Sequence, residues 1–186
     1  DTAFFAGDAA NFIVGRSDTG RVRIGDLRTG AESEGVDTTD SVESLGFDDG
    51  KVAVSSVIDN LAVLGTNKAE TISAGADAAR IFGFAGDDLI KASAAGQQID
   101  GGLGFDTVTF AEASGGVTVN LSDAADNTGL AAGSTFSDVE AVTGSDFDDD
   151  LTGDGADSNL CGGDGGETRD GGAGGGTGGG GGGRGG

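Results

Sequence analysis

The sequence contains no histidine among its 186 residues. A Ser-His-Asp or Cys-His arrangement therefore cannot form within it, and neither can an H-E-x-x-H zinc site. Pairs of aspartates could in principle serve a glycosidase, but here they fall in repeated turns expected to be open to water, with nothing to raise one pKa. We therefore expect that the chain is not an enzyme.

Basic residues are scarce, with 10 Lys and Arg against 32 Asp and Glu and a formal net charge of -22. Binding to nucleic acid is not expected, because contacts to phosphate need a basic surface. No basic residue lies between Lys91 and Arg169, an interval that is rich in Asp and Glu. Such a surface repels itself unless cations neutralise it. Cation binding is the favoured interpretation, and acidity that confers only solubility is the alternative.

Long apolar runs are also missing, because no window of about 18 residues is apolar enough to predict a transmembrane segment. The single cysteine, Cys161, excludes an internal disulfide framework. An intermolecular disulfide stays open beside the simpler interpretation of an incidental, outward-facing side chain. The chain starts at Asp1 without an initiator methionine or a signal-like segment, so we expect a fragment or a mature segment of a longer protein.

Aliphatic residues recur at a spacing of nine in the middle of the chain, at Ile72, Ile81, Ile90, Ile99 and Val108. They occupy the eighth position of nonapeptides. Residues 101–109, GGLGFDTVT, fit G-G-x-G-x-D-x-U-x throughout, where U is a large aliphatic residue. Residues 83–91, GFAGDDLIK, fit with Phe84 in place of the second glycine. A period of nine is neither helical nor that of a simple strand, and it indicates a solenoid in which each repeat adds one turn and one short strand.

Two nonapeptides make one coil, so every second turn falls on the same side and turn 83–88 lies directly beneath turn 101–106. This stacking brings Asp88 and Asp106 towards one another, with many turn carbonyl groups nearby. Carboxylates and carbonyls suit a hard cation that takes about six to eight oxygen ligands, and Ca²⁺ is the obvious one.

On these nonapeptides the chain resembles the RTX (repeats-in-toxin) family of haemolysin-type calcium-binding proteins. The resemblance implies a right-handed parallel β-roll solenoid, Ca²⁺ bound between stacked turns, and bacterial secretion by a type I exporter. It extends to VESLGFDDG at 42–50 and to GVTVNL at 116–121, which resemble segments that flank such repeats.

The expected metal ligands of the first site are carboxylates and carbonyls from Gly83, Ala85, Asp87, Asp88, Gly101, Leu103, Phe105 and Asp106. A weaker site could use Glu70 one coil below. Asp149 and Glu167 are also one coil apart and make a second candidate edge. On the opposite edge of the first block, Ala79 and Gln97 occupy the aspartate positions, so we expect no Ca²⁺ there, or at most a poor site using Asp77.

The expected fold is all-β, a β-roll in two blocks with a small antiparallel module beside it. The predicted domains are an antiparallel β-module at 1–55 with a turn at 18–20, a first roll block at 56–110, a β-hairpin and loop insertion at 111–143, and a second, glycine-rich block at 144–186. The insertion is interpreted as a hairpin that covers the sheet, and a binding loop is the alternative. In the second block the eighth position reads Leu151, Leu160, Arg169 and Gly178, so the pattern dissolves into glycine.

These features favour a secreted structural protein of the bacterial cell surface or extracellular matrix (a filament, S-layer or adhesin) that folds and self-assembles with Ca²⁺. Open solenoid ends invite chain-to-chain addition, so we expect a homo-oligomer or filament. The first alternative is the calcium-dependent C-terminal secretion module of a larger RTX enzyme, a protease or lipase. The second is a piece of a pore-forming toxin.

Overall fold

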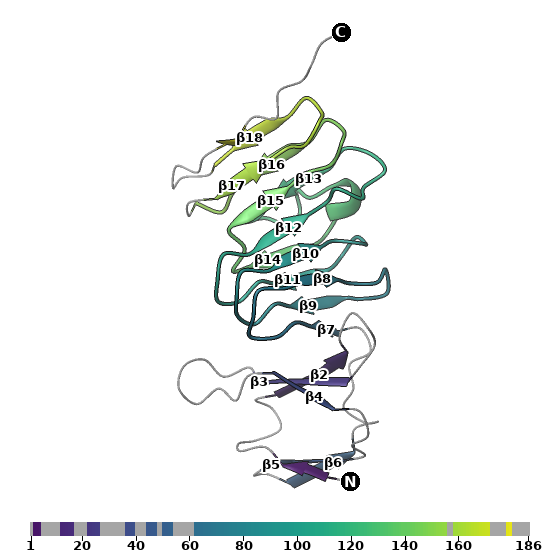
Figure 1. Ribbon diagram of the computed structural model, residues 1–186. Coiled ribbons are helices and arrows are strands. Elements are labelled where there is room, and N and C mark those ends of the chain that lie inside the picture. The colour runs from purple at the N-terminus through teal and green to yellow at the C-terminus, as the bar shows by residue number, and fades with distance from the viewer. Residues whose placement is uncertain are drawn as a thin grey trace.

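The computed structural model describes residues 2–4, 12–16, 22–26, 36–39, 44–47, 50–53, 62–155, 158–171 and 178–179. They form a stack of short strands that rises from a small β part at the N-terminal end (Figure 1). Helical structure in these ranges is limited to one 3-10 turn, η2 (Gly129–Ala131). No helix in the described ranges is long and apolar enough to cross a membrane. The described chain is therefore nearly all β.

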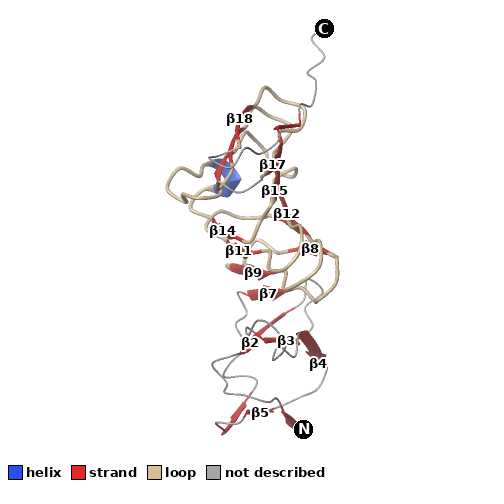
Figure 2. Ribbon diagram, turned by 90° about the vertical axis from the view of Figure 1, so that its left-hand side faces the viewer, coloured by secondary structure: helices blue, strands red, loops and turns tan. Residues whose placement is uncertain are grey.

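The strands of the roll stack in two columns, which Figure 2 shows edge-on. One column is a single parallel sheet of β8 (Thr71–Ser73), β10 (Leu89–Lys91), β12 (Thr107–Thr109), β15 (Ala141–Thr143), β17 (Asn159–Cys161) and β19 (Gly178–Gly179). The other column contains two sheets. Its lower part holds β7 (Ala62–Leu64), β9 (Arg80–Phe82), β11 (Gln98–Asp100) and β14 (Thr135–Ser137), and its upper part holds β13 (Thr118–Asn120), β16 (Asp150–Thr152) and β18 (Thr168–Asp170).

The aliphatic eighth positions form the core between the columns. Ile90 lies beside Ile72 on one side and Val108 on the other, and Ile99 lies beside Ile81, so every second repeat pairs, as the spacing predicts. All five side chains are at most 3% exposed. In most of these short strands, such as β8, β10 and β11, only the middle side chain is buried, so the core is thin. The stability of each coil therefore depends on very few residues.

The insertion differs from the hairpin that its sequence predicts. β12 pairs with β15, so Val108 lies beside Val142 and the chain between them is longer than the two nonapeptides of a regular coil. β13 does not cover the sheet. It pairs in parallel with β16 and places Val119 beside Leu151, both fully buried, before β14 returns to pair with β11. The chain thus contributes a strand to the upper sheet before it completes the lower one, and the core continues without a break.

Antiparallel strands precede the roll. β2 (Phe12–Arg16), β3 (Val22–Asp26) and β4 (Val36–Thr39) pair antiparallel, and β2 also pairs in parallel with β7, so this part extends the lower sheet. β5 (Ser44–Phe47) and β6 (Gly50–Ala53) form an antiparallel pair, and β1 (Thr2–Phe4) joins β5 in parallel. The predicted turn at 18–20 and most of the glycine-rich end of the second block lie outside the described residues.

Candidate metal-binding edge

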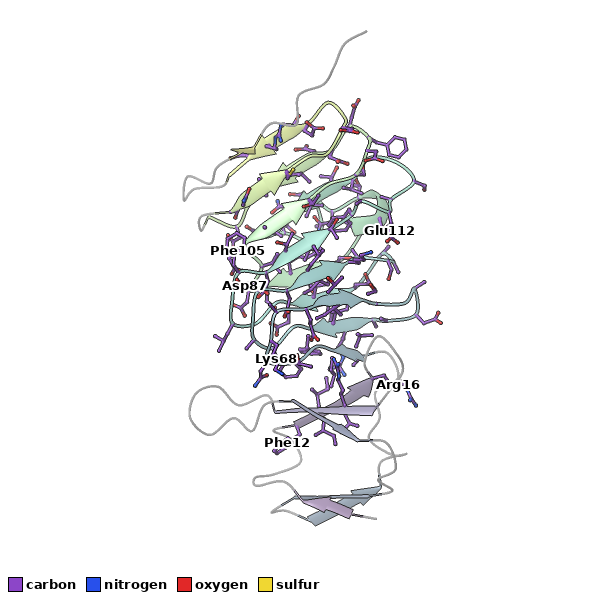
Figure 3. All side chains as sticks on the ribbon, in the orientation of Figure 1. Phe12, Arg16, Lys68, Asp87, Phe105 and Glu112 are labelled. Atoms are coloured by element: carbon purple, nitrogen blue, oxygen red, sulfur yellow. The ribbon has the colours of Figure 1, made fainter. Side chains whose placement is uncertain are left out.

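One edge of the roll carries the turns that lead into β8, β10, β12 and β15, and we call it the aspartate edge. It consists of residues 65–70, 83–88, 101–106 and the shorter turn 138–140. In Figure 3, Lys68, Asp87 and Phe105 mark this edge, whereas Glu112 lies on the opposite one. The three long turns have the same length and recur once per coil, so equivalent atoms of successive turns stack on one another.

The residue before each strand of the aspartate edge forms a ladder of carboxylates. Asp88 Oδ1 accepts a hydrogen bond of 2.9 Å from the Glu70 main-chain N–H, and Asp106 Oδ1 accepts one of 2.8 Å from the Asp88 N–H. Glu140 continues the ladder, because its Oε2 accepts a 2.7 Å bond from the Asp106 N–H. Each carboxylate thus uses one oxygen to tie its coil to the coil below.

The second oxygen of the ladder aspartates is left without a partner. Asp88 and Asp106 are 2% and 0% exposed, and neither Asp88 Oδ2 nor Asp106 Oδ2 has a hydrogen-bond partner. A buried carboxylate oxygen without a hydrogen bond or a counter-charge is costly. Glu70 Oε1, at the lower end of the same edge, is also buried without a hydrogen-bond partner, so three carboxylate oxygens of the edge need a cation or a proton.

Main-chain carbonyl oxygens lie around the same positions. A Cβ added at Gly83 would lie 2.6 Å from Asp88 Oδ2 and against the carbonyl oxygen of Gly101, in the next turn. A Cβ at Gly101 would likewise lie 2.7 Å from Asp106 Oδ2 and against the carbonyl oxygen of Asp138. Each first-position glycine thus leaves a small space that a carboxylate and the carbonyl of the following turn both border. We call these spaces the Gly83 cradle and the Gly101 cradle.

A third cradle lies one coil below. A Cβ at Gly65 would lie 2.7 Å from both Glu70 Oε1 and the Gly83 carbonyl oxygen. Carboxylate and carbonyl oxygens are the ligands that Ca²⁺ takes in proteins. The donor set of the three cradles therefore fits the ion that the nonapeptides suggest.

The ladder aspartates are not open to water, contrary to what the sequence suggested. The pKa of Asp88 is raised from 3.8 to about 6, mainly by burial and also by repulsion from Asp106, while the hydrogen bond from the Glu70 N–H opposes the rise. Burial also raises the pKa of Asp106, as does repulsion from Glu140. Without a bound cation, the folded state therefore disfavours the ionised form of these two carboxylates.

The remaining expected ligands of the first site have different surroundings. Asp87 Oδ1 accepts a 3.0 Å bond from the Phe105 main-chain N–H, which ties two turns together at the surface. Ala85 and Leu103 form a bridge between the same turns, and the Leu103 carbonyl accepts a bond from Gly86 N–H. The side chains of Leu103 and Phe105 are exposed. These residues hold the turns in register, while the cradles are bordered by Asp88, Asp106 and glycine carbonyls.

The second candidate pair lies on the opposite edge, and internal groups already contact its carboxylates. Both oxygens of buried Asp149 are hydrogen-bonded: Oδ1 to the Val117 N–H (2.8 Å) and the Ser145 hydroxyl (2.8 Å), and Oδ2 to the Ser145 N–H (2.7 Å). Glu167 Oε2 lies 3.3 Å from the Arg169 guanidinium. Asp149 therefore differs from the ladder aspartates, whereas Glu167 keeps its Oε1 buried without a hydrogen-bond partner.

Gln97 takes the place of the ladder aspartate on the opposite edge of the first block. Its side chain is 1% exposed. Oε1 accepts bonds of 3.1 and 3.4 Å from the N–H groups of Ser93 and Ala94, and Nε2 donates to the Ala78 carbonyl at 3.0 Å. The neutral amide thus satisfies its turn without a cation. Asp77, the other residue considered for this edge, is exposed.

Replacement of Gln97 by alanine is expected to destabilise the protein by about 1–3 kcal/mol, because buried N–H and C=O groups lose their partners. Urea unfolding measures the change, with Gln98→Ala as the matched control, since Gln98 is the next residue and is exposed. The loss should be the same in EDTA and in Ca²⁺. A loss that appears only in Ca²⁺ would contradict the role assigned to this amide.

The sequence did not lead us to expect Glu140 among the carboxylates of this edge. It lies two positions before Val142, which is buried in the core, so counting back from that aliphatic residue would have placed it at the ladder position. Among the described residues, no group of three or more His, Cys, Asp or Glu side chains is arranged to hold a metal. Each cradle instead combines one carboxylate with main-chain oxygens.

No protein-family model matches this sequence, and no sequence among the curated proteins matches it. Among solved structures, the chain is similar to the crystal structure of the extracellular lipase LipA from Serratia marcescens, with 19% sequence identity and a TM-score of 0.30. The match covers 87% of this chain and 25% of that chain, so this chain spans about a quarter of the lipase's length. The function proposed below rests on the geometry of the turns.

Proposed function

We propose that this chain is a secreted calcium-binding structural protein of the bacterial cell surface or extracellular matrix, and that it folds and assembles with Ca²⁺. The observation that carries the proposal is the pair of buried, unpartnered oxygens, Asp88 Oδ2 and Asp106 Oδ2, each beside the carbonyl of a following turn. Such oxygens favour a bound cation over an empty site.

The residues that would hold Ca²⁺ are those that border the cradles. Asp88 and the Gly101 carbonyl would serve the Gly83 cradle, and Asp106 and the Asp138 carbonyl would serve the Gly101 cradle. When bound, the ion supplies positive charge and additional coordination between successive coils. The aspartates hold the turns in register through their other oxygens, so they would position ligands from two coils at once.

The mechanism is folding linked to ion binding. With a net charge of -22 and a single buried side chain in most strands of the roll, the chain has strong self-repulsion and a thin core. Extracellular calcium modules bind at about 10⁻⁴–10⁻³ M. At a free concentration about 100-fold above Kd, each site contributes about 2.7 kcal/mol. The free energy contributed by a few occupied sites is therefore comparable with the total stability of a small domain.

The proposal assigns a structural role and no catalytic one, in keeping with a sequence that has no histidine. Extracellular Ca²⁺ concentrations would fold the chain after export, whereas low cytosolic Ca²⁺ would leave it loose, which suits the secretion implied by the RTX resemblance. Copies would associate through strand edges and open coil ends, which offer unpaired main-chain groups.

The EDTA-treated chain is expected to be only partly folded, and titration with Ca²⁺ should convert the remaining coil to β structure near millimolar Ca²⁺, followed by growth in light scattering. Circular dichroism follows the folding and scattering follows the assembly. Mg²⁺ at equal ionic strength is the control, because it keeps more of its water and demands octahedral geometry. The expected result is a transition with Ca²⁺ that Mg²⁺ does not reproduce.

The two readouts separate the alternatives. A transition without growth in scattering would contradict the assembly part of the proposal and favour the secretion module of a larger RTX enzyme or toxin. A chain that shows no transition with Ca²⁺ would contradict calcium binding itself.

A further inference from the structure

At the lower end of the aspartate edge, an arginine side chain lies beside the Gly65 cradle. Arg23, on β3 of the antiparallel part, donates from Nη1 to the Leu64 carbonyl, and the same nitrogen lies 3.9 Å from Glu70 Oε1. Both side chains are largely buried. Glu70 Oε1 is also the oxygen that borders the Gly65 cradle. The guanidinium therefore approaches the carboxylate oxygen that a metal ion in this cradle would use.

A second guanidinium occupies the upper end of the roll. Arg169 stands at the eighth position of its nonapeptide, where the preceding repeats place an aliphatic side chain, and it pairs with Leu151 of the strand below. Its Nη2 lies 3.3 Å from Glu167 Oε2, and the two side chains are 17% and 3% exposed. A Cβ at Gly162 would meet carbon atoms of Glu167 instead of oxygens. The space of this turn is thus filled by the Glu167 side chain itself, with an arginine beside its carboxylate.

The turns between these ends differ. All four carboxylates keep one buried oxygen without a hydrogen-bond partner, so the difference lies in the ion pairs. Glu70 and Glu167 each lie within ion-pair distance of an arginine, whereas within the described ranges Asp88 and Asp106 form no ion pair with a basic side chain. Glutamate takes the aspartate position at Glu70 and Glu167, and arginine accompanies both, whereas the ladder glutamate Glu140 accepts the Asp106 N–H instead. The longer glutamate side chain lets the carboxylate reach a guanidinium from a neighbouring strand.

We propose that Arg23 and Arg169 act as built-in cations at the two ends of the roll, so that Glu70 and Glu167 bind arginine in place of Ca²⁺ and metal binding is confined to Asp88 and Asp106. The inference rests on the proposed calcium function and specifies which turns take the ion. Arginine stays charged at any physiological pH, so the end coils are neutralised whether or not Ca²⁺ is present. The end coils would then stay folded without Ca²⁺, whereas the stability of the middle coils would depend on the ion.

The test compares Ca²⁺ bound per chain, measured by equilibrium dialysis, with urea unfolding in EDTA, for the wild type, Arg169→Gln, Arg169→Lys and Glu167→Gln. In EDTA, Arg169→Gln should unfold at lower urea, because Glu167 stays buried without a cation, while Arg169→Lys should retain most of the wild-type midpoint. With Ca²⁺, Arg169→Gln should recover its midpoint and bind about one additional ion per chain, because the freed carboxylate becomes a ligand. Glu167→Gln should leave the number of bound ions unchanged.

Arg23→Gln should behave like Arg169→Gln at the other end. Arg80→Gln is the matched control, since Arg80 lies over the Phe82 ring, 5.9 Å from its centroid, on a central strand. A loss of bound Ca²⁺ in Glu167→Gln would overturn the inference, because Glu167 would then already be a ligand. Equal unfolding midpoints for Arg169→Gln and the wild type in EDTA would also overturn it.

The two proposals fail in different ways. If the wild type binds no Ca²⁺, the calcium function fails, and a double-mutant cycle in EDTA still tests the arginines. The double variant Arg169→Gln/Glu167→Gln should then be more stable than Arg169→Gln, since it removes the stranded carboxylate. A double variant no more stable than the single one would contradict the role of Arg169.

Discussion

The double variant Asp88→Asn/Asp106→Asn is expected to lose the Ca²⁺-dependent transition and, in EDTA, to be more stable than the wild type. Asparagine keeps an oxygen that can accept the ladder bonds from Glu70 and Asp88 N–H, so the coils remain tied. The exchange removes two buried charges whose pKa values burial has raised. In Ca²⁺ the variant should lack about 2.7 kcal/mol for each lost site, at a free concentration about 100-fold above Kd.

The order of stabilities should therefore reverse between the two conditions. Urea unfolding in EDTA and in Ca²⁺ measures this reversal. The control is Asp146→Asn/Asp164→Asn, which makes the same change in net charge at two exposed positions of the opposite edge. If the control loses the Ca²⁺ response as fully as the ladder variant, general charge screening would explain the response and the cradles would not be its cause.

Replacement of Ile90 by alanine is expected to cost about 2–5 kcal/mol, the range for deletion of a large aliphatic side chain from a core. Ile90 is fully buried and lies between Ile72 and Val108 in the same sheet. Because each strand contributes a single inward side chain, no other residue of β10 can fill the cavity. The loss is a large fraction of the stability of a small domain and should unfold much of the roll in EDTA.

The matched control for Ile90→Ala is Leu89→Ala, the preceding residue on the same strand, whose side chain is 37% exposed. Leu89→Ala should change the urea midpoint far less. Unlike the aspartate exchange, the effect of Ile90→Ala should persist in Ca²⁺, since it comes from packing. Equal losses for the two variants would contradict the assignment of the eighth position to the core.

The repeat allowed a large part of the roll to be predicted from the sequence. Strands 71–73, 80–82, 89–91, 98–100 and 107–109 and their pairing follow from the period of nine, because a constant local period makes equivalent residues stack without help from distant contacts. The same argument placed Asp88 and Asp106 on one edge. The alternation of apolar and polar residues before the roll likewise indicated antiparallel strands, as in β2, β3, β5 and β6.

Only the tertiary structure decided what happens where the period breaks. The partner of β13 is β16, because burial of Val119 against Leu151 joins segments that the chain separates by the whole insertion, and no local pattern specifies that choice. The tertiary structure also decided which groups contact which carboxylates. Arg23 reaches Glu70 only because β2 and β3 extend the lower sheet, and Val117 N–H reaches Asp149 only because β13 lies beside β16. The contact of Ser145 with Asp149, in contrast, is local to one turn. The sequence by itself thus determined which residues are equivalent, while long-range packing decided which equivalent carboxylates remain available to a cation.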